Sequence, residues 1–234
     1  MAHILDNPGW SALTTGNRYL AEGNNEAKYF FKNVAAFVGL KDNSATGATQ
    51  GFKALYELTL HDGPFIFITP DRIEIPKQFK VVRKLICFQM IFDTALVVPE
   101  LTANPVELTE KDVPQMMELT TLTNPGPFIE RTVEFGHYYG IFDGEKLVAM
   151  AGQRMYALPY AEISAVCTHP DYLGRGYAKQ LLLHQAGRIM AANDIPYLHV
   201  RDDNHRAIEV YKSVGFKTRT ALNFYVLMKN SPQI

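Results

Sequence analysis

Apolar and polar positions in the second half of the chain repeat with the periods of helices and strands. The spacing predicts a short helix over residues 110–123, capped by Thr109, and a second helical segment over residues 129–136. Apolar segments flank Asp143-Gly144, a pair that suits the tight turn of a β-hairpin. We therefore expect two helices followed by an antiparallel hairpin.

Residues 160–168 alternate between two sets of side chains, as in a strand with two different faces. One predicted face carries Ala161, Ile163, Ala165 and Cys167, and the other carries Glu162, Ser164, Val166 and Thr168. Further along, the pattern predicts a helix over 177–192, a strand over 196–200, a helix over 205–215 and a strand over 221–229. A strand, a helix and a strand in this order form a right-handed parallel pair. The expected fold class is therefore α/β, with a central mixed sheet flanked by helices.

The first hundred residues carry weaker signals. Residues 25–40 have apolar side chains at helical spacing, whereas residues 63–70 and 81–92 are apolar runs typical of strands. A polar segment rich in proline follows. We place a domain boundary there, between a smaller α/β lobe over residues 1–102 and a main domain over residues 103–234.

Composition narrows the classes of function. The chain has 234 residues, of which 47% are hydrophobic, and its formal net charge is −1. This balance gives no electrostatic basis for binding nucleic acid or an anionic membrane. No apolar run approaches the roughly 20 residues that span a bilayer, and the N-terminal segment lacks the pattern of a signal peptide. Cys87 and Cys167 favour two buried reduced thiols over one disulfide, so we expect a cytoplasmic protein.

Gly174, Arg175 and Gly176 directly precede the helix predicted to begin at residue 177. A helix N-terminus exposes unpaired N–H groups and the positive end of the helix dipole, and glycines let a ligand approach the backbone. Arg175 adds a positive charge, so the expected ligand is a phosphate or diphosphate. Lys179 stands where a dinucleotide-binding motif needs a third glycine, and no P-loop sequence is present. A tight turn with glycines for steric reasons alone explains this spacing equally well.

Two ordered motifs in the second half resemble those of the GNAT superfamily of N-acetyltransferases. The first is a strand followed by Gly-x-Gly at the start of a helix, and its opening position carries Leu173 instead of Arg or Gln. The second motif, Asn-x-x-Ala-x-x-x-Tyr-x-x-x-Gly-Phe, is complete as Asn204, Ala207, Tyr211, Gly215 and Phe216. The resemblance covers about residues 105–229. It implies a GNAT-like fold and acetyl-coenzyme A as the acetyl donor.

The resemblance also implies which residues contact the coenzyme. Backbone N–H groups of the glycine turn would hold the diphosphate, and a strand that diverges from its neighbour would bind the pantetheine and the thioester carbonyl. The residues implied are Val166, Cys167, Thr168, Leu173, Gly174, Arg175, Gly176, Tyr177, Ala178, Asn204, Ala207 and Tyr211. Asn204 equally suits a helix cap, and the two roles are compatible.

Acetyl transfer from a thioester to an amine requires a deprotonated amine and a proton for the leaving thiolate. The resemblance places Tyr211 near the sulfur as the acid, against the alternative of an aromatic that only packs on the last helix. Glu162 stands where some family members carry a glutamate that takes the amine proton through water. A partly desolvated carboxylate has a raised pKa that suits this role, whereas an exposed glutamate at a strand edge does not. Both interpretations of Glu162 stay open.

The acceptor is expected to be a primary amine on a small molecule or peptide, and the sequence shows little of its pocket. Phe128 lies in a break between the first helices, in a loop that lines the acceptor pocket in the family. Residues 1–102 suit a lobe over the pocket, a homodimer surface or a diverged copy of the fold. No metal-ligand spacing links the histidines. Because Leu173 removes a side chain near the phosphates, a non-catalytic acyl-coenzyme A sensor or interaction module remains an alternative to the enzyme.

Overall fold

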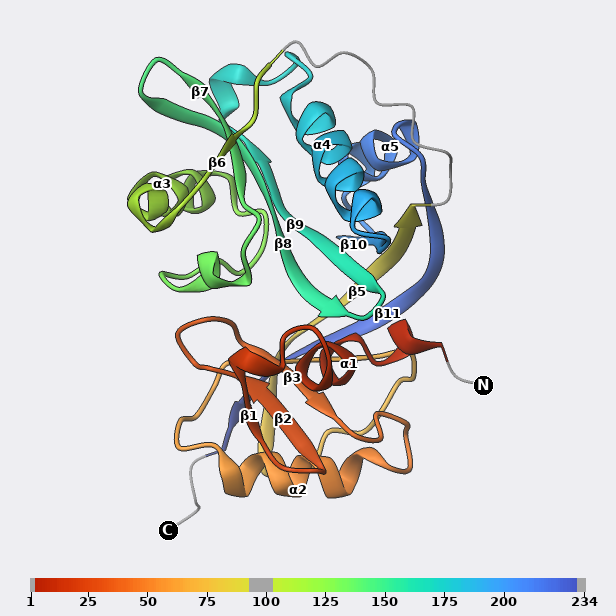
Figure 1. Cartoon of the computed structure of the whole chain (residues 1–234). Helices are drawn as coiled ribbons and strands as arrows, with labels where there is room; N and C mark the ends of the chain where they lie inside the picture. Colours follow the sequence, from red (N-terminus) through yellow and green to blue (C-terminus); the bar gives the residue numbers. More distant parts are fainter. Residues whose placement is uncertain (1–2, 93–102, 231–234) are drawn as a thin grey trace.

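A computed structural model describes residues 3–92 and 103–230 of the chain. The domain boundary expected near residue 102 therefore lies outside the described residues. Strands from both halves of the chain join one mixed sheet with helices packed against it (Figure 1). The expected α/β class is confirmed. No helix within the described ranges is both long enough and apolar enough to cross a bilayer.

The described strands form an eleven-stranded sheet in the order β1-β2-β3-β4-β11-β5-β10-β9-β8-β7-β6. The strands are β1 (Ala21–Gly23), β2 (Ala27–Phe30), β3 (Phe37–Leu40), β4 (Phe65–Thr69), β5 (Phe79–Phe92), β6 (Val106–Glu107), β7 (Tyr139–Asp143), β8 (Lys146–Ala157), β9 (Tyr160–Thr168), β10 (Ile195–Arg201) and β11 (Phe216–Lys229). β9 and β10 are parallel, as the sequence predicts, and so are β3 and β4.

Helices cover both faces of this sheet (Figure 1). They are α1 (Pro8–Thr14), α2 (Ala48–Leu58), α3 (Val113–Thr123), α4 (Tyr177–Ala191) and α5 (His205–Ser213), with 3₁₀ turns at Ile4–Asp6, Arg18–Leu20, Glu110–Asp112, Thr132–Phe135 and Pro170–Tyr172. On one face, Leu198 of β10 packs in a cluster with Leu182 of α4. On the other face, Tyr197 joins a cluster that includes Leu13 of α1 and Met116 of α3. Adjacent residues of β10 thus enter opposite cores, as expected for a strand covered on both sides.

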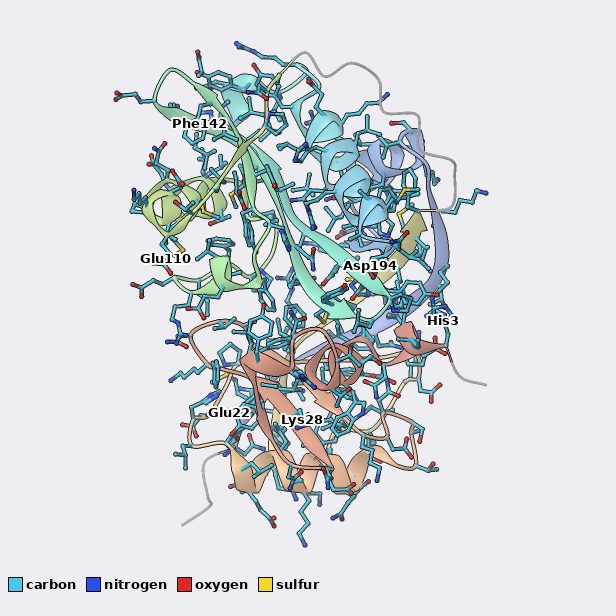
Figure 2. All side chains as sticks on the ribbon, in the orientation of Figure 1. His3, Glu22, Lys28, Glu110, Phe142 and Asp194 are labelled. Carbon is cyan, nitrogen blue, oxygen red and sulfur yellow. The ribbon has the colours of Figure 1, made fainter. Side chains whose placement is uncertain are left out.

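Two long strands connect the halves of the molecule. β5 and β11 each have 14 residues and pair with one another along most of their length. Residues 87–91 of β5 also pair with β10, and residues 223–227 of β11 pair with β4. A strand from the first hundred residues therefore lies inside the sheet that carries β9 and β10. Side chains fill the space between the β8–β9 hairpin and the N-terminal elements (Figure 2).

The helix expected over residues 25–40 is wrong. This segment forms β2 and β3, which pair in antiparallel fashion. Phe30, Val34 and Phe37 are nevertheless buried in one cluster. A turn between two short strands brings these side chains to the same side, so their spacing reflects common burial and not a helical period. Pairing with neighbouring strands overrides the local pattern.

Most other expected elements are confirmed. The apolar runs are β4 and β5, the hairpin is β7–β8, and the later helices and strands are α4, β10, α5 and β11. Thr109 caps the 3₁₀ turn that leads into α3, with a reciprocal bond to Asp112. Residues 129–136 form only a 3₁₀ turn and not the expected helix.

The alternation expected along β9 breaks at Ala165. This residue has a φ of 53°, and β9 carries one extra residue relative to β8 between Ser164 and Cys167. Such a β-bulge reverses the direction of the side chains that follow it. Ala161 and Ile163 pack on the α4 side of the sheet, whereas Cys167 packs on the opposite side. The four residues expected on one face are therefore divided between both faces.

α1 packs so closely on β3 that Gly39 has no room for a side chain. A Cβ on Gly39 would lie 2.3 Å from the backbone nitrogen of Trp10. We expect Gly39→Ala to lower the free energy of unfolding by about 3 kcal/mol, at the upper end of what overpacking costs. In the control Gly144→Ala, a Cβ would meet nothing within 4 Å and only the φ of 59° is strained, which costs about 1 kcal/mol. Equal losses for the two variants in urea denaturation would contradict this packing.

Candidate active site

Gly174, Arg175 and Gly176 form the turn that leads from β9 towards α4. The two glycines have φ values of 81° and 77°, in the left-handed region that glycine adopts without strain. A Cβ on Gly174 would meet nothing within 4 Å, so the space beside the turn is open. Within the described residues no side chain caps α4, and its first backbone hydrogen bond runs from the Gln180 N–H to the Gly176 carbonyl. The N–H groups of the turn and of the first helical residues therefore remain available to an anion.

An aromatic side chain holds Arg175 beside this turn. The Arg175 guanidinium lies over the ring of Tyr172, with 4.6 Å between its Cζ and the ring centroid. The Tyr172 hydroxyl donates a hydrogen bond of 2.7 Å to Asp143 Oδ2. An open depression of about 600 Å³ adjoins the turn, and its lining includes Arg175, Tyr177 and Phe142. A positive charge and the uncapped N-terminus of α4 thus adjoin the same open region.

β9 and β10 separate before the chain reaches this turn. Their last paired residues are Glu162 and Tyr197, whereas β10 continues to pair with β5 as far as Arg201. The bulge at Ala165 follows directly after the point of separation. A gap therefore opens between the two parallel strands on the side that leads to the glycine turn.

Backbone donors of β9 line the gap. The N–H of His169 donates to the Val148 carbonyl of β8 at 2.8 Å. Because successive residues of a strand direct their N–H groups to opposite edges, Thr168 and Val166 present theirs away from β8. The Thr168 hydroxyl oxygen is also buried and has no hydrogen-bond partner in the described part of the chain. Polar groups with no partner among the described residues thus lie where the resemblance to the GNAT superfamily implies a thioester.

Tyr211 lies in the last turn of α5, with its ring centroid 6.3 Å from that of Phe216. Burial raises the pKa of Tyr211 to about 12, and the Cys167 thiol has a smaller effect in the same direction. The phenol therefore keeps its proton at neutral pH and is able to donate it. Its packing role and a role as a proton donor are both compatible with this position.

Asn204 caps α5, as the sequence allows. Its Oδ1 accepts a hydrogen bond of 3.2 Å from the Ala207 N–H. Leu173 extends from the turn before Gly174 and is 47% exposed. The side chain that replaces Arg or Gln in the first motif is therefore in contact with solvent.

Phe128 packs in the core of the protein. It is 8% exposed and meets the ring of Tyr138 edge-on, with 5.6 Å between the centroids. Its neighbours Pro127 and Ile129, in contrast, line a cavity. The loop expected to line the acceptor pocket therefore borders a cavity, but through Pro127 and Ile129 and not through Phe128.

Glu162 is fully buried, so it is not an exposed residue at a strand edge. Arg154 of β8 binds its carboxylate through two hydrogen bonds, Nη2 to Oε1 at 2.6 Å and Nε to Oε2 at 2.8 Å. His199 Nδ1 lies 2.7 Å from Oε1. Burial would raise the pKa of Glu162, but Arg154 and His199 outweigh burial and lower the pKa to about 2. The pKa is therefore shifted in the direction opposite to the raised value that would suit a general base.

Buried polar side chains continue from Glu162 across the sheet. Gln89 Nε2 donates to the Leu5 carbonyl and lies 3.0 Å from His199 Nε2, while Gln89 Oε1 accepts from Arg219. Because this amide nitrogen only donates, His199 Nε2 accepts, and its Nδ1–H donates to Glu162. This assignment gives Gln89, His199 and Glu162 a consistent pattern of donors and acceptors.

The patterns in the sequence did not point to Arg154, Gln89 and Arg219. A signal exists for Gln89, an isolated polar residue inside an apolar strand, and for Arg154, which follows Gln153 in a polar pair inside an otherwise apolar strand. Arg219 carries no such signal, since its neighbours are polar. It lies at a bulge in β11, where it also binds Asp6 at 2.6 Å. The long-range partners of these residues are visible only in the folded chain.

Neither cysteine is activated. Cys87 and Cys167 are buried and form no disulfide, as the sequence favours. Burial raises the pKa of Cys87 to about 12 and that of Cys167 to about 11, so both remain protonated thiols. Within the described ranges, no three metal-ligating side chains gather. Backbone N–H groups, Tyr211 and Arg175 are therefore the candidate groups for the chemistry of this site.

Comparison with known proteins identifies relatives over this region and over the whole chain. A family model described as FR47-like protein matches residues 138–225, from the β7–β8 hairpin to β11. A crystal structure of a putative acetyltransferase from the GNAT family of Novosphingobium aromaticivorans DSM 12444 is 31% identical and has a TM-score of 0.88. The match covers 98% of this chain and 100% of that chain.

Two further relatives match more distantly or over shorter segments. N-alpha-acetyltransferase RimI of Mycobacterium tuberculosis is 37% identical over 84 residues, which are 35% of this chain and 52% of that protein. The chain thus spans about half the length of RimI. A GCN5-related N-acetyltransferase from Kribbella flavida is 12% identical, with a TM-score of 0.64 over 96% of this chain and 95% of that chain, and shares the fold. Because the relative from Novosphingobium aromaticivorans matches along its entire length, the chain belongs to the GNAT family of acetyltransferases.

Proposed function

We propose that this chain is an acetyl-coenzyme A-dependent N-acetyltransferase that acts on a primary amine. The observation that carries the proposal is the turn at residues 174–176, which has open space beside Gly174 and leads into α4 without a side-chain cap, together with the gap between β9 and β10. Membership of the GNAT family supports acyl transfer as the reaction class. A relative named as an N-alpha-acetyltransferase supports an amine as the acceptor.

The residues present fit a coenzyme with a diphosphate and a polar arm. N–H groups of residues 174–178 suit the diphosphate, and Arg175 offsets its charge. The N–H groups of Val166 and Thr168 suit the amide and thioester oxygens. Asn204 uses its Oδ1 to cap α5, which leaves its Nδ2 group to donate to the arm. These contacts use the backbone and uncharged donors for most of the ligand.

Bound acetyl-coenzyme A supplies an acetyl group activated as a thioester. Backbone donors at Val166 and Thr168 are fixed by the β8–β9 pairing before any ligand arrives, so they stabilise negative charge on a carbonyl oxygen without reorganisation. Tyr211 holds a proton on its Oη at neutral pH, and we assign it as the donor to the departing sulfur.

We assign Glu162 a positioning role in place of the expected role as base. Its Oε1 contacts Arg154 and His199, and its Oε2 accepts from Arg154 and from the Met155 N–H at 3.3 Å. A fully buried carboxylate with this set of donors has no oxygen free to take a proton from an amine through water. It instead fixes β9 where that strand leaves β10.

A non-catalytic acyl-coenzyme A sensor is the second candidate, favoured by the solvent-exposed Leu173 at a position where a polar side chain would meet the phosphates. Release of free thiol from acetyl-coenzyme A, measured with a broad set of primary amines, distinguishes the two candidates. The enzyme releases thiol in the presence of at least one amine class. A sensor binds the coenzyme and releases none.

Reversing the charge at Arg175 tests the diphosphate contact. Arg175→Glu places a carboxylate beside the bound phosphates, so we expect the affinity for acetyl-coenzyme A to fall by at least about tenfold. Isothermal titration calorimetry measures the dissociation constant, and Arg72→Glu on an exposed loop is the control for net charge. Equal affinities for wild type and Arg175→Glu would contradict the placement of the diphosphate.

Removing the phenolic hydroxyl tests Tyr211. We expect Tyr211→Phe to lower kcat about 100-fold, because a positioned proton donor contributes that much, and to leave KM for acetyl-coenzyme A unchanged. The thiol-release assay with a responsive amine gives both constants. Tyr19→Phe, at a residue that is 59% exposed, controls for the loss of a tyrosine hydroxyl. An unchanged kcat would remove Tyr211 from the reaction.

The role of Glu162 is tested by stability as a function of pH. Glu162→Gln leaves Arg154 as a buried unpaired charge, so we expect the free energy of unfolding at pH 7 to fall by about 3–5 kcal/mol. Because the folded-state pKa of about 2 lies below the ordinary value of 4.5, the ionised carboxylate stabilises the fold above pH 4.5 and loses this effect as the pH falls towards 2. The deficit of the variant therefore shrinks in acid.

The double variant Arg154→Met/Glu162→Leu is the matched control, since replacing both charges removes the unpaired group. It should recover much of the stability that Glu162→Gln loses. A Glu162→Gln protein with native stability and an altered acidic limb of its pH–rate profile would instead support the role as base.

A further inference from the structure

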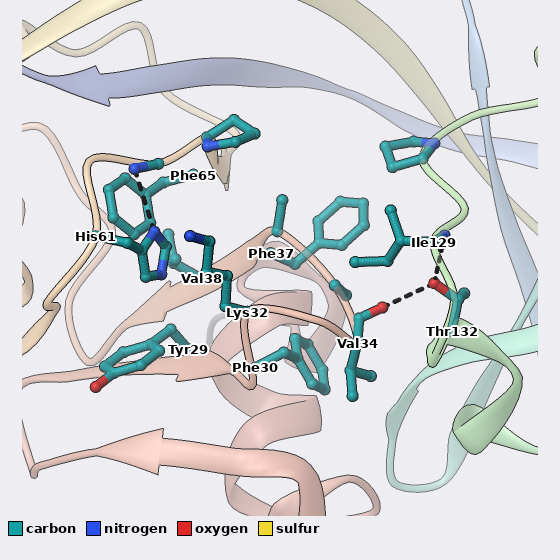
Figure 3. A pocket seen from close by; sticks show the side chains of 15 residues that line it. Tyr29, Phe30, Lys32, Val34, Phe37, Val38, His61, Phe65, Ile129 and Thr132 are labelled. Carbon is teal, nitrogen blue, oxygen red and sulfur yellow. Dashed lines mark hydrogen bonds between the residues drawn. The ribbon is translucent and has the colours of Figure 1, made fainter.

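A partly enclosed cavity lies apart from the glycine turn, between the N-terminal strands and the loop after α3. We call it the N-terminal cavity. It has a volume of about 220 Å³, and its walls include Phe30, Val34, Phe37, Phe65 and Ile129. Figure 3 shows Phe37 and Ile129 facing one another across this space. An engineered protein cavity of about 150 Å³ holds a benzene molecule, so this volume suits an aromatic ring with a short chain.

The inner wall of the cavity offers an occupant almost no polar partner. Thr132 is a buried polar residue in the lining, and its hydroxyl already donates to the Val34 carbonyl at 2.8 Å and accepts from the Ile129 N–H at 2.9 Å. With its polar atoms satisfied, this region favours an apolar group over water. The body of the ligand is therefore expected to be hydrocarbon.

The mouth of the cavity has the opposite character. The side chain of Lys32, which is exposed, extends towards His61 (Figure 3). His61 Nδ1 accepts a hydrogen bond of 3.2 Å from the Gly63 N–H, so its Nε2 carries the proton and donates. Burial lowers the pKa of His61, and the charge of Lys32 lowers it further, which keeps the ring neutral. In the described part of the chain neither the Lys32 ammonium nor His61 Nε2 has a hydrogen-bond acceptor.

We propose that the N-terminal cavity binds a small amphipathic carboxylate, with an aromatic or short aliphatic body against the apolar wall and its carboxylate between Lys32 and His61. A cation and a neutral donor at one end of an apolar space match a single anionic group on a hydrocarbon body. An ammonium group at the same end would face Lys32 with like charge. The N-terminal cavity thus selects its ligand by charge at the mouth and by shape in the interior.

The cavity also touches the buried network of the candidate active site. Phe37 forms part of its wall, and the Arg154 guanidinium lies over the Phe37 ring with 4.4 Å between Cζ and the centroid. The same guanidinium holds Glu162. An occupant of the cavity therefore contacts the ring that supports the charge pair on β8 and β9.

Three probes with the same body test the proposal: 3-phenylpropanoate, 3-phenylpropan-1-ol and 3-phenylpropan-1-aminium. Calorimetry on the full chain without coenzyme should show that the carboxylate binds at least about tenfold more tightly than the alcohol, as expected for a charge-assisted hydrogen bond. The ammonium probe should bind most weakly. The His61 ring resonances in an NMR spectrum should shift with the carboxylate, which places it at the mouth.

Lys32→Gln should remove the preference for the carboxylate and leave the affinity for the alcohol unchanged, whereas Lys53→Gln, at an exposed position on α2, should keep the preference. Ala36→Phe fills the cavity and should weaken all three probes; if this variant fails to fold, the comparison of the two lysine variants stands alone. No binding by any probe, no preference for the carboxylate, or a preference that survives Lys32→Gln would overturn the proposal. None of these measurements depends on the proposed acetyl transfer.

Discussion

The buried charge pair of Arg154 and Glu162 lies where β9 makes its last contact with β10. Two charges taken out of water are stable only while each satisfies the other, and removing one typically costs several kcal/mol. His199 on β10 binds the same carboxylate. The pair and the histidine therefore hold β8, β9 and β10 at a fixed spacing as far as Glu162. The backbone donors of the gap follow Glu162 along β9.

The first hundred residues contribute to the same constraint. β5 lies between β10 and β11, and from β5 Gln89 reaches His199. The ring of Phe37 on β3 packs against the Arg154 guanidinium. The position of β9 thus depends on side chains from strands that are far apart in the sequence. The proposed coenzyme site in the second half of the chain is therefore supported by residues of the first half.

Local signals account for what the sequence predicts well. The hairpin at Asp143-Gly144, the turn at Gly174-Arg175-Gly176 and the cap at Asn204 each depend on neighbouring residues, and all three are present in the structure. The position of β5 between β10 and β11 depends on pairing between segments that are distant in the sequence. A local pattern of apolar residues carries no information about such pairing. The pKa of Glu162 depends on partners 8 and 37 residues away along the chain. A glutamate in a strand therefore gives no sign of whether its pKa is raised or lowered.

The central claim is that backbone N–H groups hold the coenzyme. Amide hydrogen exchange with and without acetyl-coenzyme A measures these groups one by one. The account predicts slower exchange on binding at Thr168 and at residues 174–178, with little change in β3. Binding of acetyl-coenzyme A that leaves the exchange of these amides unchanged would contradict it.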